Sequence, residues 1–324
     1  MNKPLQIVMT PVRNEAWVLP AFLTATSQWT DYIIIADQMS TDGSRELYEQ
    51  FPTVVVIDNT NPNFNESERQ TMLIAKAREV AAGRDTLLWG LDADEILAAN
   101  TFGTNDWKRI ITSKPGDVFY FKWAELSSNK KTYGDSVFYP WLFHDDGKEP
   151  HQNYVRNMHS MRIPYPIEEK QIYYVKDFRI LHLAYLNPAR IESKCRFYQF
   201  VDWSMNHRDP VSLSRNYSYN KKLETQIITN DMLAYDNFDL WDKVNCTNIK
   251  FWFDDYIIIR IANSNIKDVA KLDIWTKDFI KLVNISDPRS WIIKILHWYL
   301  RKTSKFKSLL IIRGIDKILK KIKL

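Results

Sequence analysis

Two carboxylates separated by one residue, Asp92-Ala93-Asp94, are the feature of this sequence best suited to chemistry. They follow Thr86–Leu91, an apolar run with the composition of a buried strand. Residues two apart on an extended backbone project to the same side, and carboxylate oxygens are ligands that Mg²⁺ and Mn²⁺ prefer. Such an ion can neutralise the charge on a diphosphate leaving group. For the pair alone, a solvated acidic turn that caps a helix is the alternative.

Two other polar clusters, Pro11–Glu15 and Asp37–Gly43, also follow apolar runs. Strands predicted by these and neighbouring runs span 5–10, 32–36, 53–57 and 86–91, and the helices between them span about 16–27, 44–51 and 66–82. Alternating strands and helices predict a parallel sheet covered by helices. Ligands bind beyond the carboxyl ends of such strands, so the three polar clusters are predicted to meet at one edge.

The remainder of the chain has a different hydrophobic pattern. Further short strands are predicted at 118–122, 137–139, 173–175 and 180–183. After Pro188 the pattern is largely helical. We therefore expect one compact catalytic domain followed by a helical extension, with no internal repeat.

Three motifs in the first hundred residues resemble those of family 2 glycosyltransferases of the GT-A fold. They are TPVRNEA at 10–16, IIIADQMSTDGS at 33–44 and GLDADE at 90–95. The resemblance implies a Rossmann-like mixed, mainly parallel sheet flanked by helices. It also implies inverting, metal-dependent transfer of a sugar from a nucleotide sugar, of which a UDP-sugar is the expected donor, to a glycan or a lipid-linked acceptor. The expected domains are 1–200, with a nucleotide-sugar half 1–100 and an acceptor half 101–200, and a helical extension 201–324.

The resemblance also assigns residue roles. Pro11 and Asp37 would line the base and ribose pocket, where a carboxylate can accept from the uracil N3–H. Asp92 would face the ribose and the Mg²⁺ or Mn²⁺, and Asp94 would bind that ion. The expected donor-binding set is completed by Arg13, Glu15, Arg69 and Lys194. Glu15 and Asn14 can instead brace their loop, and Ser40, Thr41 and Asp42 can cap the following helix.

His182, in the run Ile180–Leu183, resembles a late histidine that such folds direct at the metal. A histidine in an apolar strand can equally be a satisfied core residue. Lys194, in ESKCRFYQF, can meet a phosphate or lie on a solvated helix face.

The catalytic base is left open by the sequence. An inverting enzyme needs a carboxylate or a histidine to accept the proton of the acceptor hydroxyl. Glu168, Glu169 and His159 are the candidates, with Asp145 and Asp146 behind them. Each of these residues also has a structural or surface role as its alternative.

Composition and charge indicate the compartment of the protein and the kind of partner it has. Two cysteines far apart, Cys195 and Cys246, fit a reducing compartment. The first residues lack a secretion signal and no run is long enough to span a membrane, so we expect a cytoplasmic protein. Ten Lys or Arg and one acid make residues 291–324 strongly basic. Apolar residues recur in this tail at helical spacing, namely Ile311, Ile315, Ile318, Leu319 and Ile322.

Several alternatives stay open at this stage. The basic helix can lie on the inner face of an anionic membrane or dock on the protein's own core. A nucleotidyltransferase would share the acidic metal site but usually has a glycine-rich loop after the first strand, where this chain has TPVRNEA. A degenerate transferase fold that serves as a glycan-binding scaffold is the non-catalytic reading. Nucleic acid is not an expected partner, because the net positive charge lies in the tail and not across an aromatic platform.

Overall fold

The chain divides into two compact units. The first comprises Met1–Leu186 and Leu223–Lys250, and the second comprises Asn187–Lys222 and Phe251–Leu324. The division comes earlier than the expected boundary at residue 200, because that residue lies inside one helix, α5 (Pro188–Asn206). This computed structural model describes residues 3–148, 158–164, 171–217, 225–247 and 251–321.

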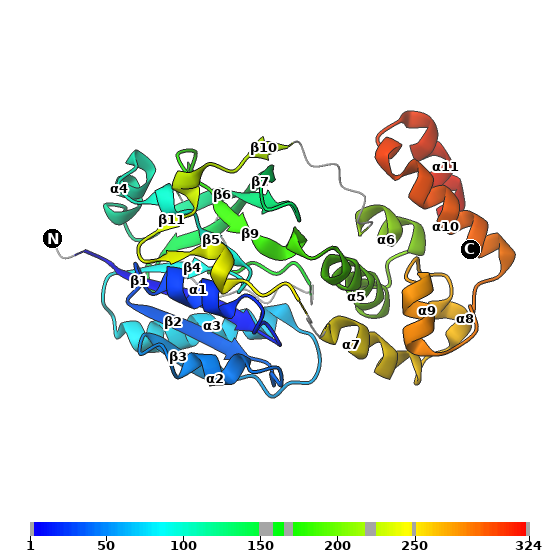
Figure 1. Cartoon of the computed structure of the whole chain (residues 1–324), viewed down its shortest axis with the longest axis horizontal. Helices are drawn as coiled ribbons and strands as arrows, with labels where there is room; N and C mark the ends of the chain where they lie inside the picture. Colours follow the sequence, from blue (N-terminus) through cyan, green and yellow to red (C-terminus); the bar gives the residue numbers. More distant parts are fainter. Residues whose placement is uncertain (1–2, 149–157, 165–170, 218–224, 248–250, 322–324) are drawn as a thin grey trace. The chain divides into compact units, whose positions relative to one another are not determined.

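A ten-stranded mixed sheet forms the frame of the first unit (Figure 1). Its central path has the order β3-β2-β1-β4-β7-β6-β9-β5, with β10 paired to β7 and β8 paired to β6. All of these strands except β7 and β5 run in one direction. The strands are β1 (Leu5–Val12), β2 (Tyr32–Asp37), β3 (Val54–Asp58), β4 (Thr86–Gly90), β5 (Glu95–Leu97), β6 (Val118–Leu126), β7 (Thr132–His144), β8 (Ile172–Tyr174), β9 (Ile180–His182) and β10 (Gln226–Ile227).

Helices cover both faces of the parallel part of this sheet, as the alternation of side chains along each strand requires. On one face, Ile7, Ile34 and Leu88 pack against α3 (Glu66–Ala81). On the other face, their neighbours in sequence belong to the larger core that contains α1 (Leu19–Thr26). The remaining helices of this unit are α2 (Ser44–Tyr48) and α4 (Asn105–Ile111). The expected fold class, a mixed and mainly parallel sheet flanked by helices, is confirmed.

Two local expectations are corrected by the structure. Strand β1 continues through Pro11 to Val12. Its pairing with β4 ends at Met9, so the missing N–H of Pro11 faces no partner strand there. The N-cap residue of α2 is Gly43, which has a left-handed conformation with φ 94° and no side chain to act as a cap. Of the three residues predicted to cap this helix, Asp42 accepts from the amide of Ser44, its first residue, over 3.0 Å, whereas Ser40 and Thr41 contact the loop after β1.

The segment Leu223–Lys250 belongs to the first unit although it follows two helices of the second. Its side chains Met232, Leu240 and Val244 are part of the large core. The hydroxyl of Tyr235 donates to the carbonyl of Leu97 over 2.7 Å. Besides β10, this segment forms a small hairpin of β11 (Ala234–Tyr235) and β12 (Phe238–Asp239).

The second unit is helical in the part that the structure describes. Arg196 of α5 forms a two-pronged ion pair with Asp254 over 2.9 and 2.7 Å, and Phe197 packs among three aromatic rings of α7 (Trp252–Ile261). No helix of the described residues is both long and apolar enough to cross a membrane. The helices of this unit are α5, α6 (Pro210–Asn216), α7 (Trp252–Ile261), α8 (Ile266–Val269), α9 (Lys277–Val283), α10 (Trp291–Thr303) and α11 (Leu310–Lys321).

Candidate active site

An acidic turn follows β4 and leads directly into β5. Asp94 is 3% exposed and Glu95 is fully buried. Strand β5 pairs antiparallel with β9, which sets Glu95 opposite His182, and the amide of Leu183 donates to the carbonyl of Asp94 over 2.8 Å. This register brings the ligand atoms of Asp94, Glu95 and His182 within 4.8 Å of one another.

Arg162 balances part of the charge of this turn. Its guanidinium donates to Asp92 and to Glu95, each over 2.6 Å. The backbone that carries Arg162 crosses β4 closely, since a Cβ placed on Gly90 would lie only 2.6 Å from the Cβ of Arg162. A side chain at position 90 would therefore push Arg162 away from the two carboxylates.

The buried charges perturb one another. Burial raises the pKa of Glu95 to about 8, and Asp92 and Asp94 add to the rise while Arg162 opposes it. Burial alone would lower the pKa of Arg162, but the adjacent carboxylates of Asp92 and Glu95 raise it. Glu95 Oε1 is buried and has no hydrogen-bond partner among the described residues. A buried acceptor left without a donor is costly, and a cation would satisfy it.

The cluster of Asp94, Glu95 and His182 therefore fits a divalent cation. Two carboxylates and an imidazole supply donor atoms for Mg²⁺ or Mn²⁺ and leave further coordination positions for water or phosphate oxygens. His182 Nε2 lies 3.9 Å from Asp94 Oδ1, so both atoms can face one ion. Asp92, predicted as a metal ligand, is paired with Arg162.

An aromatic wall adjoins this cluster, and we use that name for Trp123 of β6 with Tyr139 and Trp141 of β7. The ring of Trp123 stacks on His182 at 4.4 Å with an interplanar angle of 25°. Trp123 also contacts Trp141 at 4.6 Å and Tyr139 at 4.9 Å. Tyr139 is 38% exposed, so the wall reaches solvent. Aromatic faces of this kind suit the apolar face of a sugar ring.

Asp37, predicted to meet the nucleotide base, lies at the end of β2 and is buried. Its carboxylate accepts from Arg45 Nη1 at 2.8 Å, from the Tyr48 hydroxyl at 2.8 Å and from the amide of Ser40 at 3.1 Å. Three protein donors thus surround the two oxygens. Asp37 holds α2 against the sheet in this structure, and its role in donor binding stays a prediction.

The loop after β1 is braced by the loop after β2. The amides of Asn14, Glu15 and Ala16 donate to Ser40 Oγ, Ser44 Oγ and Asp42 Oδ2, each over 3.0 Å. Asn14 has a positive φ of 55°, and its side-chain oxygen accepts from the amide of Thr41. The Ser-Thr-Asp-Gly-Ser motif therefore shapes the first loop, and its Asp42 also accepts from the first amide of α2.

The other predicted donor-site residues lie as follows. Pro11, Arg13 and Glu15 are half-buried in the braced stretch, and the carboxylate of Glu15 accepts from the indole N–H of Trp17. Arg69 lies on α3 with its guanidinium 5.5 Å from the ring of Phe64. Lys194 lies on α5 of the second unit, 5.9 Å from the ring of Tyr198.

The structure describes only some of the residues predicted as the catalytic base. Glu168 and Glu169 lie outside the described residues. His159 is exposed and has a φ of 60°. Asp145 accepts two hydrogen bonds from Arg78, over 3.0 and 2.7 Å, and so has a structural partner.

Sequence reasoning missed three residues of the cluster and its surroundings, namely Glu95, Arg162 and Trp123. Glu95 had a signal, because it follows Asp94 directly in GLDADE. Arg162 had none, since it is 70 residues from Asp92 and its own segment carries no motif. Trp123 is one of twelve tryptophans, and only the pairing of β6 with β9 singles it out.

No protein-family model and no curated protein sequence matches this chain. Among solved structures, part of the chain is similar to GalNAc-T7 crystallised with UDP, GalNAc and Mn²⁺, with 12% identity and a TM-score of 0.37 over 56% of this chain and 44% of that one. It is also similar to 4-diphosphocytidyl-2C-methyl-D-erythritol synthase, with 14% identity and a TM-score of 0.30 over 44% of this chain and 76% of that one. The chain spans less than half the length of the GalNAc-T7 chain that it matches.

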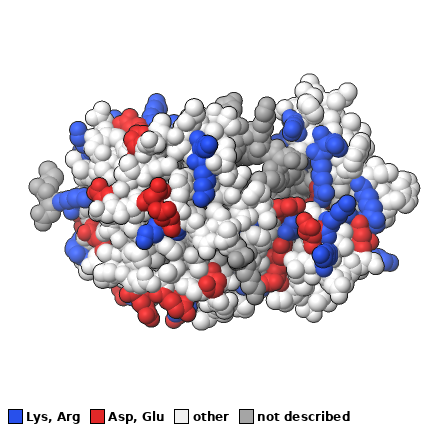
Figure 2. All heavy atoms as spheres, in the orientation of Figure 1, with Lys and Arg blue, Asp and Glu red and all other residues white. Residues whose placement is uncertain are grey.

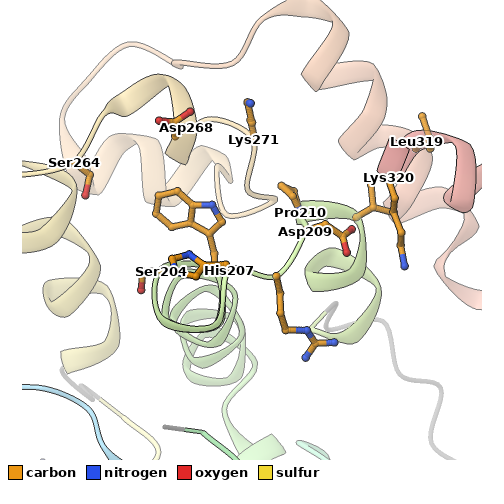
Figure 3. Close-up of a pocket in the computed structure, with 12 residues that line it drawn as sticks. Ser204, His207, Asp209, Pro210, Ser264, Asp268, Lys271, Leu319 and Lys320 are labelled. Carbon is orange, nitrogen blue, oxygen red and sulfur yellow. The ribbon is translucent and has the colours of Figure 1, made fainter. Parts of the chain in front are cut away.

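The second unit contains a cavity of about 550 Å³, and Figure 3 shows its lining. Asp209, which points into it, caps α6 by accepting from the amide of Ser212 over 2.8 Å. The other lining residues include Lys271, Lys320 and His207, which is the C-cap residue of α5. No cluster of three metal-binding side chains is found there in the described part of the chain. The acidic turn of the first unit is therefore the better candidate for catalysis.

Proposed function

We propose that this chain is a glycosyltransferase that moves a sugar from a nucleotide sugar, with a UDP-sugar as the expected donor, to a glycan or lipid-linked acceptor. The observation that supports it most is the buried cluster of Asp94, Glu95 and His182 beside the aromatic wall. A site with unsatisfied carboxylate capacity suits the cation that accompanies a diphosphate. An aromatic surface next to it suits a sugar ring.

Each group in the site has a role under this proposal. A divalent ion held by Asp94, Glu95 and His182 would stabilise the negative charge of the departing nucleoside diphosphate. Arg162 orients Asp92 and Glu95 and presents its own positive charge beside the same position. The aromatic wall positions a sugar and excludes water from one side of it. The acceptor hydroxyl loses its proton to a base, for which Glu168, Glu169 and His159 stay the candidates.

The second candidate class is nucleotidyl transfer, which uses acidic metal sites at strand ends as well. The first loop disfavours this class, because its amides bind the side chains of Ser40, Asp42 and Ser44. A phosphate-cradling loop needs such amides unpaired.

Thermal denaturation with ligand panels tests the proposal. A ligand that binds only the folded protein raises its melting temperature by mass action. We expect a nucleoside diphosphate sugar to do so only with Mn²⁺ or Mg²⁺ present, and to lose the effect in Asp94→Asn. Stabilisation by a nucleoside triphosphate together with a sugar phosphate, and not by nucleotide sugars, would favour nucleotidyl transfer instead.

A further inference from the structure

Two exposed apolar stripes lie on the last two helices. In α10, Trp291, Ile295 and Trp298 are 71%, 56% and 62% exposed. In α11, Ile311, Ile315 and Ile318 are 74%, 39% and 59% exposed. Each set has spacing i, i+4, i+7, which places its members on one side of its helix. We call these the α10 stripe and the α11 stripe. Large apolar residues aligned in this way at the surface mark an interaction site.

The α11 stripe faces outward because the opposite side of the helix is anchored. Asp316 accepts from Arg215 Nε at 2.8 Å and from Arg215 Nη2 at 2.9 Å. Ile312 is 8% exposed, and Leu319 packs against the cluster formed by α6 and α10. Docking on the protein's own core therefore takes the side of α11 with Ile312, Asp316 and Leu319, and it leaves the α11 stripe exposed.

The charge that residues 291–324 bring to the surface is positive. Asp316, the sole acid of residues 291–324, is buried against Arg215 and adds no charge to the surface. Figure 2 shows Lys and Arg side chains beside uncharged surface over this region. Six basic side chains have no ion pair or hydrogen bond within the described residues, namely Lys302, Lys305, Arg313, Lys317, Lys320 and Lys321.

We propose that the two stripes and these six basic residues bind the surface of an anionic lipid bilayer. The apolar side chains enter the boundary between headgroups and acyl chains, and the lysines contact anionic headgroups. Tryptophan is enriched at that depth in membrane proteins, which suits Trp291 and Trp298. A second copy of this chain is a less suitable binding partner for the stripes, because it would bring two basic surfaces together.

Vesicle co-sedimentation of the full chain tests the proposal. We expect it to pellet with phosphatidylcholine vesicles that contain phosphatidylglycerol, and to pellet little with phosphatidylcholine alone. Added salt should weaken this binding, because ions screen exposed charges. Removing residues 303–324 is a poor test, since it would leave Arg215 buried without Asp316.

Point variants separate the two contributions. Lys317→Glu with Lys321→Glu and, separately, Ile311→Ser with Ile318→Ser should each lower the vesicle partition coefficient at least tenfold. The matched controls should bind as the native chain does. They are Lys277→Glu with Lys281→Glu, an equally spaced pair on α9, and Ile259→Ser, whose side chain is 64% exposed on α7.

Native binding to neutral vesicles as strong as to anionic ones, or no binding to either, would overturn the proposal. So would an unchanged partition in both α11 variants. Sedimentation velocity without lipid tests whether the chain associates with itself instead. A dimer that dissociates in Ile311→Ser would assign the α11 stripe to contact with a second copy. Circular dichroism verifies that each variant is folded. Because lipid binding is measured without substrate, the result is independent of the proposed transferase activity.

Discussion

Buried charges are arranged differently in the two units. In the second unit they form matched pairs: Arg196 with Asp254, and Arg215 with Asp316, each joined by two hydrogen bonds. In the acidic turn of the first unit, half-buried Asp92 and buried Asp94 and Glu95 lie around Arg162 and His182, and Glu95 Oε1 lacks a partner in the described residues.

This contrast distinguishes buried charges that stabilise the fold from buried charges that can bind a ligand. A matched buried pair satisfies its own hydrogen-bonding capacity, so its loss leaves one charge uncompensated and lowers stability. A cluster with excess negative charge costs stability until a cation arrives, which is typical of functional sites.

The largest effect is expected for Asp94→Asn in the acidic turn. The change keeps the size of the side chain and removes the charge that a cation needs. If the ion contributes several kcal/mol to the transition state, turnover should fall by about 1000-fold. Steady-state kinetics with the donor found by thermal denaturation measure it. Near-native turnover with an unchanged dependence on metal would remove Asp94 from the site.

Asp254→Asn in the second unit should act on stability instead. It removes the carboxylate that pairs with Arg196 through two hydrogen bonds and leaves only the partly exposed Glu192, whose Oε1 lies 3.7 Å from Arg196 Nη1. Breaking a buried pair costs about 3–5 kcal/mol, and we expect the lower end of that range because Glu192 remains. Denaturant unfolding measures the loss. We expect the metal-dependent stabilisation by nucleotide sugar to persist in the folded fraction. A loss below about 1 kcal/mol would show that the two units do not differ in the way described.

The pH dependence of the metal-free protein should report the excess charge. Because the pKa of Glu95 is raised to about 8 in the folded state, folding favours its protonated form. The stability that follows is fully present below the pKa of an unfolded glutamate and is lost as pH rises toward 8. We expect a loss on the order of 5 kcal/mol.

Melting temperatures across this range, with chelator present, provide the measurement for Glu95. Glu95→Gln carries no titratable group, so its stability should fall less over the same range. Mn²⁺ should stabilise the native chain more at the upper end than at the lower end, since a deprotonated carboxylate binds the ion. Parallel curves for the variant and the native chain would contradict the assignment.

The smallest effect is expected at the exposed edge of the aromatic wall. Tyr139→Ala should raise the acceptor KM by about tenfold, the equivalent of one stacking contact, and should leave UDP affinity unchanged. Tyr174→Ala, on β8 with 50% exposure, is the matched control. An equal effect of both variants would show that Tyr139 has no particular contact with a substrate.

The elements of the parallel sheet were accessible from the sequence because each has its own hydrophobic pattern. The runs at 5–10, 32–36 and 86–91 become β1, β2 and β4, and the helix predicted at 66–82 becomes α3. The acidic turn was found for the same reason, since Asp92 and Asp94 follow a buried strand directly. These features depend on neighbours in sequence, and a local pattern is sufficient to predict them.

The features that were missed depend on contacts between distant residues. Glu95 joins His182 only through the antiparallel pairing of β5 with β9, and β5 has three residues. Arg162 reaches Asp92 from a segment 70 residues away. The segment Leu223–Lys250 returns to the first unit through core side chains such as Met232 and Leu240. Its strands have two residues each, which is too short to give a periodic signal.

Calorimetric titration of UDP into the metal-free protein, then into the protein saturated with Mn²⁺, tests the central claim most directly. The account predicts that UDP binds measurably only with Mn²⁺ present, and that Asp94→Asn abolishes this gain while melting no lower than the native chain in the absence of metal. Equal UDP affinity with and without Mn²⁺, or a gain that Asp94→Asn retains in full, would contradict the claim that this acidic turn binds a metal-bound nucleotide.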